Sequence, residues 1–147
     1  MDIYKVNFLG AFTAVIILSL CSMIFIFRLL SYQKVEYWLG IILILSAIPL
    51  AYLLFTANQF QRPTIYYVQI GIMIGFLILE LFLDYVYKIE FRNNTRIIII
   101  YLGLFFGGTG GMIGIAAQAS KLWMIAAIIL FLIMMILSFI QRAITGM

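Results

Sequence analysis

The residues best suited to chemistry are two carboxylates, Glu80 and Asp84, at the end of a long apolar run. Drawn on a helix at ~100° per residue, Gln69, Glu80, Asp84 and Tyr87 fall within roughly 60° of arc. A carboxylate inside an apolar segment is costly unless it is neutralised, paired or hydrated, so its presence suggests a function. We expect this polar face to bind a proton, a cation or a cationic substrate.

A purely structural role for the same carboxylates is open as well. Arg28 ends the first apolar run, on the side of the membrane where Glu80 should also lie. Glu80, Asp84 and Lys88 are spaced four residues apart, which is the pattern of an ion-pair ladder on a helix that emerges into water. Arg28 is therefore a candidate ion-pair partner for Glu80, in which case the carboxylate would stabilise the fold without binding a ligand.

Enzyme chemistry finds little support in the residue types. The chain has no histidine and one cysteine, Cys21, so it lacks Ser–His nucleophile systems, cysteine clusters and the usual zinc ligand sets. Two carboxylates alone are a sparse ligand set for a cation such as Ca²⁺. We expect no catalytic site, no metal and no cofactor.

Glycines concentrate in two of the later apolar runs. Gly71 and Gly75 form a G-x-x-x-G pair on the side of the helix opposite Glu80. In the next run, all but one of six glycines share about 100° of arc, and Gly108 is the exception. Glycine lets two backbones approach closely, so we expect these faces to contact other helices. The glycines assigned to helix packing are Gly71, Gly75, Gly103, Gly107, Gly111 and Gly114.

These residues belong to a chain that is 67% hydrophobic and 10% charged, with a mean hydropathy of +1.22. A soluble domain needs more polar surface than this, so lipid is the expected solvent. Polar residues divide the chain into five apolar runs, each close to the ~20 residues that cross a ~30 Å hydrocarbon layer as a helix. The sequence predicts one domain, an all-α bundle of five transmembrane helices at approximately residues 8–27, 37–55, 65–83, 97–117 and 122–140.

The main alternative has four spans, with the glycine-rich fourth run re-entrant or locally unwound. Orientation follows from Lys and Arg, which are enriched in cytoplasmic loops. In the five-helix arrangement the N-terminal side holds three of them, Lys5, Arg62 and Lys121. The other side holds six, Arg28, Lys34, Lys88, Arg92, Arg96 and Arg142. The N-terminus is therefore predicted outside and the C-terminus in the cytoplasm.

The net charge of +4 comes from basic residues that stand mostly singly between apolar runs, unlike the basic patches that bind nucleic acid. The expected partners are the lipid bilayer and either further copies of this chain or other membrane subunits. Two functions remain open: a small transport or conduction protein that uses the carboxylate face, and a non-catalytic membrane subunit that assembles through its glycine faces. The shared face of Gln69, Glu80, Asp84 and Tyr87 favours the first.

Overall fold

A computed structural model describes residues 3–86 and 95–145, with side chains for 3–83 and 95–144. The described residues are arranged as helices joined by short turns. In chain order these are α1 (Ile3–Leu29), α2 (Gln33–Leu45), α3 (Ala47–Ala57), α4 (Thr64–Glu80), the π-helical η1 (Leu81–Val86), α5 (Thr95–Ala117) and α6 (Lys121–Thr145). Within this part of the chain, five helices are long and apolar enough to cross a membrane, with α2 and α3 together counting as one.

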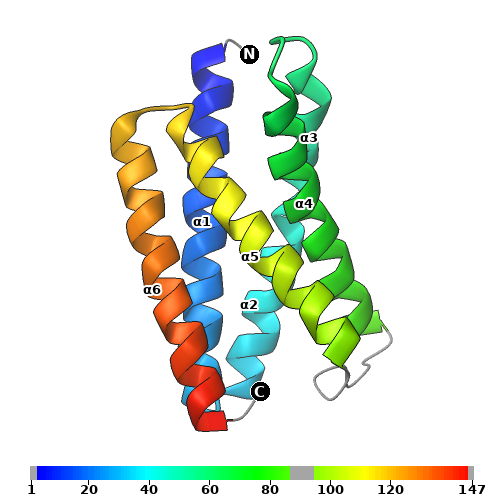
Figure 1. The fold of residues 1–147 in the computed structure, drawn as a ribbon, viewed down its shortest axis with the longest axis vertical. Helices are drawn as coiled ribbons and strands as arrows, with labels where there is room; N and C mark the ends of the chain where they lie inside the picture. Colours follow the sequence, from blue (N-terminus) through cyan, green and yellow to red (C-terminus); the bar gives the residue numbers. More distant parts are fainter. Residues whose placement is uncertain (1–2, 87–94, 146–147) are drawn as a thin grey trace.

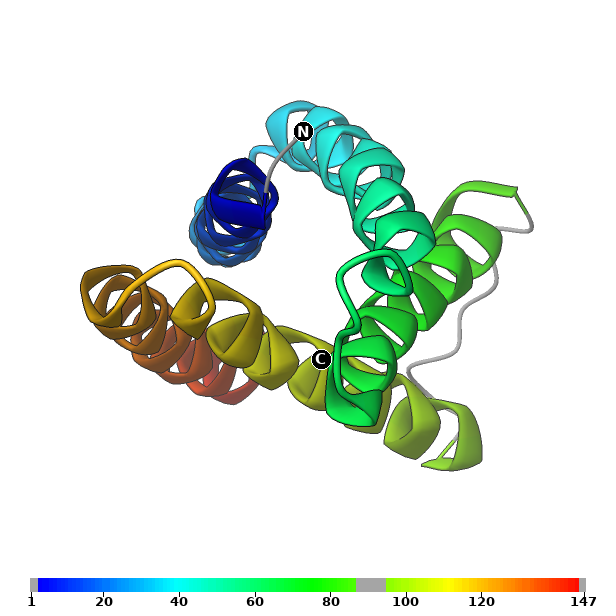
Figure 2. The ribbon, with the colours of Figure 1, turned by 90° about the horizontal axis from the view of Figure 1, so that it is seen from above.

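The five long helices run up and down a single bundle, and the two termini lie at opposite ends of it (Figure 1). Seen from above, α1, the α2–α3 pair, α4, α5 and α6 follow one another around the bundle, and α6 returns to α1 (Figure 2). The helix α5 crosses obliquely and packs against α4, α6 and α1. An odd number of long helices that alternate in direction places the two ends of the chain at opposite ends of the bundle, as observed.

The second of these long apolar helices is broken at Ser46, between α2 and α3. Pro49 has no N–H with which to reach the Leu45 carbonyl, and its ring crowds that carbonyl, so the helix cannot continue regularly. The Ser46 N–H donates to the carbonyls of Ile42 and Leu43, at 3.2 and 3.1 Å. The Ser46 hydroxyl also donates to the Leu43 carbonyl. Side chain and backbone of Ser46 thus bond to carbonyls at the end of α2.

The glycine-rich run forms one continuous helix, α5, and is not unwound. A glycine inside a helix costs roughly 1 kcal/mol relative to alanine, so the helix needs a compensating contact. Gly108 provides one, because a Cβ at this position would lie only 3.0 Å from the Met73 Cα of α4. The backbones of α4 and α5 therefore approach each other closely at Gly108, and this contact offsets part of the cost of glycine in α5.

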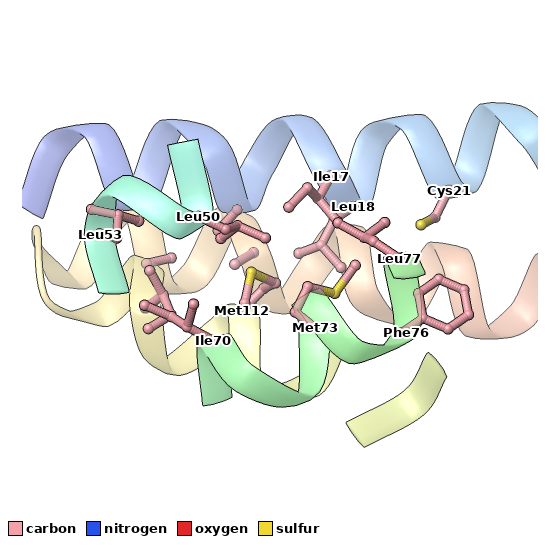
Figure 3. Close-up of a cluster of buried hydrophobic side chains, with 14 of the residues drawn as sticks. Ile17, Leu18, Cys21, Leu50, Leu53, Ile70, Met73, Phe76, Leu77 and Met112 are labelled. Carbon is pink, nitrogen blue, oxygen red and sulfur yellow. The ribbon is translucent and has the colours of Figure 1, made fainter. Parts of the chain in front are cut away.

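The core lies between α1, α3, α4 and α5 and consists of tightly packed apolar side chains (Figure 3). Its labelled members are Ile17, Leu18, Cys21, Leu50, Leu53, Ile70, Met73, Phe76, Leu77 and Met112, all of them 2% exposed or less. The outside of the bundle is apolar as well, and Phe55 and Leu122 are 85% and 78% exposed. Water would not tolerate so large an apolar surface, whereas lipid would cover it.

Candidate functional site

A cavity of about 140 Å³ lies between α1, α2, α4, α5 and α6. Its lining includes Arg28 in the last turn of α1 and Arg142 in the last turn of α6, which places it toward the C-terminal end of the bundle. The polar residues of the wall are Arg28, Glu80, Tyr101, Ser138, Gln141 and Arg142. Tyr101 stands six residues into α5, or ~9 Å along the helix axis, so the polar wall reaches below the helix ends.

Glu80 is the last residue of α4, and its half-buried side chain forms part of the cavity wall. The Tyr101 hydroxyl of α5 donates a hydrogen bond to Glu80 Oε2 at 2.5 Å. The Tyr101 ring in turn packs on Phe76, one turn before Glu80, with ring centroids 5.3 Å apart. Packing between α4 and α5 therefore positions both members of this hydrogen bond.

The π-helix η1 begins directly after Glu80. Its backbone bonds span five residues, so the α-helical spacing that predicted a shared face ends at Glu80. Asp84 lies in η1, but its side chain is outside the described residues, as is all of Tyr87. The predicted grouping of these two residues with Glu80 stays a prediction. Single π-helical turns are frequent at functional sites, and this one adjoins the carboxylate of the cavity.

Arg28 makes its ion pair with Glu36 at the start of α2, a partner that the sequence reasoning did not consider. Arg28 Nη2 lies 2.7 Å from Glu36 Oε1, and Arg28 Nε donates to the same oxygen at 2.7 Å. Arg28 also lies close enough to Glu80 and Tyr101 for a Coulomb interaction with both. Arg28, the predicted partner of Glu80, thus lines the same cavity wall, but it forms its ion pair with Glu36.

The turn between α1 and α2 explains this pairing. Ser31 adopts a left-handed conformation with φ 63°, and the Tyr32 N–H donates to the Phe27 carbonyl at 3.0 Å. This is the six-to-one bond of a Schellman motif, which reverses the chain at the end of a helix. The reversal brings the start of α2 beside the last turn of α1. An arginine at the end of one apolar run and a glutamate eight residues later are the sequence features from which this ion pair could have been predicted.

Gln69 is not part of the cavity, although it shares a helical face with Glu80. The two residues are eleven positions apart in α4, which is ~16 Å along the axis. Gln69 lies instead across the glycines of α5: a Cβ on Gly111 would be 3.1 Å from the Gln69 Cβ, and one on Gly114 would be 2.9 Å from the Gln69 Cδ. The structure therefore does not bring Gln69 and Glu80 together in this cavity, because a helical wheel gives the angle of a residue and ignores its height along the axis.

The remaining glycines differ in their surroundings. A Cβ on Gly107 would lie 3.5 Å from Ile72, an ordinary contact. Gly108, which sequence reasoning left out of the packing face, has the closest backbone neighbour. Apart from the glycine's own chain neighbours and the nearby backbone of its own helix, no described atom comes within 4 Å of the Cβ position of Gly71, Gly75 or Gly103. For these three the predicted close helix contact is not made within the chain.

Sequence reasoning missed several residues of the cavity. Gln141 is only 2% exposed, near the end of an otherwise apolar helix, and Ser138 precedes it by one turn. The Ser138 hydroxyl donates to the Met135 carbonyl at 2.7 Å, so the helix itself satisfies this group. Tyr101 interrupts an apolar run in the same way that Glu80 does. Their polar side chains within the apolar runs of α5 and α6 are the sequence feature from which these cavity residues could have been predicted.

The opposite end of the bundle is held by Arg62, in the turn between α3 and α4. Its guanidinium donates to Asn7 of α1 and, at 3.3 Å, to the Gln118 side-chain oxygen just after α5. It also lies over the rings of Tyr66 and Phe60, 4.8 and 5.9 Å from their centroids. Arg62 thus links α1, the α3–α4 turn and the end of α5, away from the cavity.

No three His, Cys, Asp or Glu side chains gather as a metal site would require in the part of the chain that the structure describes. Comparison with protein-family models, with curated protein sequences and with solved structures finds no match to this chain. The chemistry of the cavity is therefore the basis for a functional proposal.

Proposed function

We propose that this protein crosses the membrane five times and transports or conducts a proton, a cation or a cationic substrate, with Glu80 as the binding carboxylate. The observation that supports this is that Glu80 lines a cavity formed by several helices. A carboxylate in a partly desolvated cavity wall favours a proton or a cation over an anion, because its own charge is negative. Tyr101 holds the carboxylate in the cavity wall through a hydrogen bond from its uncharged hydroxyl.

Access to the site is asymmetric. The cavity lies toward the C-terminal end, while Arg62 links helices at the N-terminal end. With the C-terminus on the cytoplasmic side, as the distribution of Lys and Arg predicts, the cavity would face the cytoplasm. A transport cycle would then require the Arg62 contacts to open on the outer side.

A second candidate is a membrane subunit without transport activity, and one observation favours it. Gly71, Gly75 and Gly103 have open space where a side chain would be, on the outside of the bundle. Small outward-facing residues allow a helix of another chain to approach closely. Further copies of this chain, or other membrane subunits, would be the partners in that case. The glycine faces and the cavity are compatible, since a transporter can also assemble as a homo-oligomer.

Proton flux into reconstituted liposomes tests the role of Glu80. Wild type, Glu80→Gln and the control Lys34→Gln, which removes an exposed charge outside the cavity wall, would be compared with a pH-sensitive dye under an imposed cation gradient. We expect the flux to be lost in Glu80→Gln and retained in Lys34→Gln, with similar thermal unfolding of all three proteins. Unchanged flux together with lower thermal stability in Glu80→Gln would refute transport through this residue and leave the structural role.

A further inference from the structure

Aromatic side chains dominate the cavity wall around Glu80. They are Phe25, Phe76, Tyr101, Phe105, Phe106 and Phe139. Phe105 connects several of them, with ring centroids 5.3 Å from Phe76, 5.1 Å from Phe106 and 5.8 Å from Phe25. The wall from α1 to α5 is therefore a continuous set of rings. Aromatic rings beside a carboxylate are the elements that recognise organic ammonium ions in proteins.

We infer that the cavity binds a small organic cation, an alkyl- or arylammonium ion, with its charge toward Glu80 and its carbon atoms against the aromatic wall. This assignment rests on the proposed function and specifies its substrate class. Inorganic cations fit less well, because they need several oxygen ligands and the wall is mostly carbon.

The charges around the cavity are compatible with a cationic ligand. Glu80 is the one carboxylate among the described residues that line the cavity. The positive charge of Arg28 is balanced by Glu36 at 2.7 Å. The Arg28 guanidinium also lies 5.7 Å from the centroid of the Phe25 ring, so a wall ring already contacts a cation. Arg142 is exposed at the end of α6, where water and salt screen its charge.

The size of the cavity limits the ligand further. Its volume of about 140 Å³ is close to the ~150 Å³ of a cavity that accepts benzene. It is well below the ~300 Å³ at which sites for drug-sized molecules begin. A single ring with one ammonium group is therefore the size that this volume suits best.

Three ligands that share one ring and differ in charge test the inference on the wild-type protein: benzylammonium, its neutral isostere ethylbenzene, and benzoate. Isothermal titration calorimetry of the purified protein in detergent would give each affinity. We expect benzylammonium to bind at least about tenfold more tightly than ethylbenzene, as expected for a desolvated charge pair, and benzoate to bind most weakly. This comparison needs no variant that has to fold.

Two variants and a control locate the site. Glu80→Gln should weaken benzylammonium binding at least about tenfold, and Phe105→Leu about threefold to tenfold, because charge attraction and ring contact are lost separately. Phe55→Leu removes an exposed ring outside the cavity and should leave the affinity unchanged. The order of these effects distinguishes the cavity from adsorption to the apolar surface.

Several results would overturn the assignment. If benzoate bound more tightly than benzylammonium, the cavity would be an anion site governed by Arg142. If ethylbenzene bound as tightly as benzylammonium, the cavity would select ligands by apolar contact and not by charge. Glu80-dependent proton flux without benzylammonium binding would remove this substrate class and leave the proposed function standing. Binding in detergent that depends on Glu80, without flux in liposomes, would instead remove transport and leave a cation site.

Discussion

Arg28 and Glu36 form an ion pair across the tight turn that joins α1 to α2, with Nη2 2.7 Å from Oε1. The two side chains are only 17% and 25% exposed, so water screens their attraction incompletely. The pair has two effects on the cavity. It fixes α2 against α1, and it keeps the charge of Arg28 balanced beside Glu80.

Glu36→Gln should therefore lower the free energy of unfolding by about 1–3 kcal/mol, because a part-buried guanidinium loses its partner. Arg28→Gln should have a similar effect, and the double variant should lose less than the sum of the two. Thermal or denaturant unfolding in detergent measures this double-mutant cycle. Strictly additive losses would show that the two residues do not interact in solution.

Two glycines of α5 should respond to alanine in opposite directions. At Gly108 the new Cβ would lie 3.0 Å from the Met73 Cα, so the helices must separate and stability should fall by about 1–3 kcal/mol. At Gly103 nothing lies within 4 Å, so alanine should stabilise the helix by up to ~1 kcal/mol. Thermal unfolding of the two variants tests this contrast. A loss at Gly103 accompanied by a smaller assembly on size-exclusion chromatography would support the contact between chains.

Arg62→Met should destabilise the N-terminal end of the bundle, since it removes hydrogen bonds to Asn7 and Gln118 while keeping an apolar stem. Two bonds to neutral acceptors suggest a loss of about 1–3 kcal/mol in unfolding free energy. Lys121→Met, which removes an exposed charge at the same end, serves as the control. Equal stability of the two variants would contradict a linking role for Arg62.

Acid should weaken the binding of benzylammonium. Lowering the pH protonates Glu80 and removes the charge that attracts the ligand. Arg28 and Arg142, which also line the cavity, keep their positive charge in acid and therefore cannot replace the carboxylate. Calorimetry at a series of pH values measures the trend, and Glu80→Gln should lose most of it.

Reporter fusions at the two ends of the chain should lie on opposite sides of the membrane, because the termini lie at opposite ends of the bundle (Figure 1). The six-to-three distribution of Lys and Arg further predicts a cytoplasmic C-terminus. Alkaline phosphatase is active outside and green fluorescent protein inside, so the two reporters give complementary signals. Activity of the same reporter at both ends would contradict five crossings.

The existence of five long helices could be predicted because length and apolarity are properties of each segment alone. The break at Ser46 was foreseeable from Pro49 for the same reason. The glycine-rich run left a continuous or a re-entrant segment open, since glycine permits both. The choice depends on the neighbour, and the neighbour is Met73 of α4, which only the folded chain places beside Gly108.

The cavity could be predicted only in part. Glu80 was identified because a carboxylate in an apolar run is conspicuous, and Arg28 because it shares the same end of the bundle. The ion pair of Arg28 depends on the left-handed turn at Ser31, which no pattern in the sequence specifies. Gln69 was grouped with Glu80 by angle, although the two differ by ~16 Å in height. Contacts between helices depend on tilt and turn geometry, which hydrophobic periodicity does not encode.

The break between α2 and α3 has a mechanical consequence. Leu50 and Leu53 fix α3 in the core, both with no exposed surface, whereas α2 carries Glu36 and Leu43 toward the cavity. Because Pro49 removes a backbone hydrogen bond at the junction, α2 and α3 together resist bending less than one continuous helix would. The junction at Ser46 is therefore the point at which α2 and α3 bend most easily relative to each other, and the Arg28–Glu36 pair resists such bending by holding the start of α2 against α1.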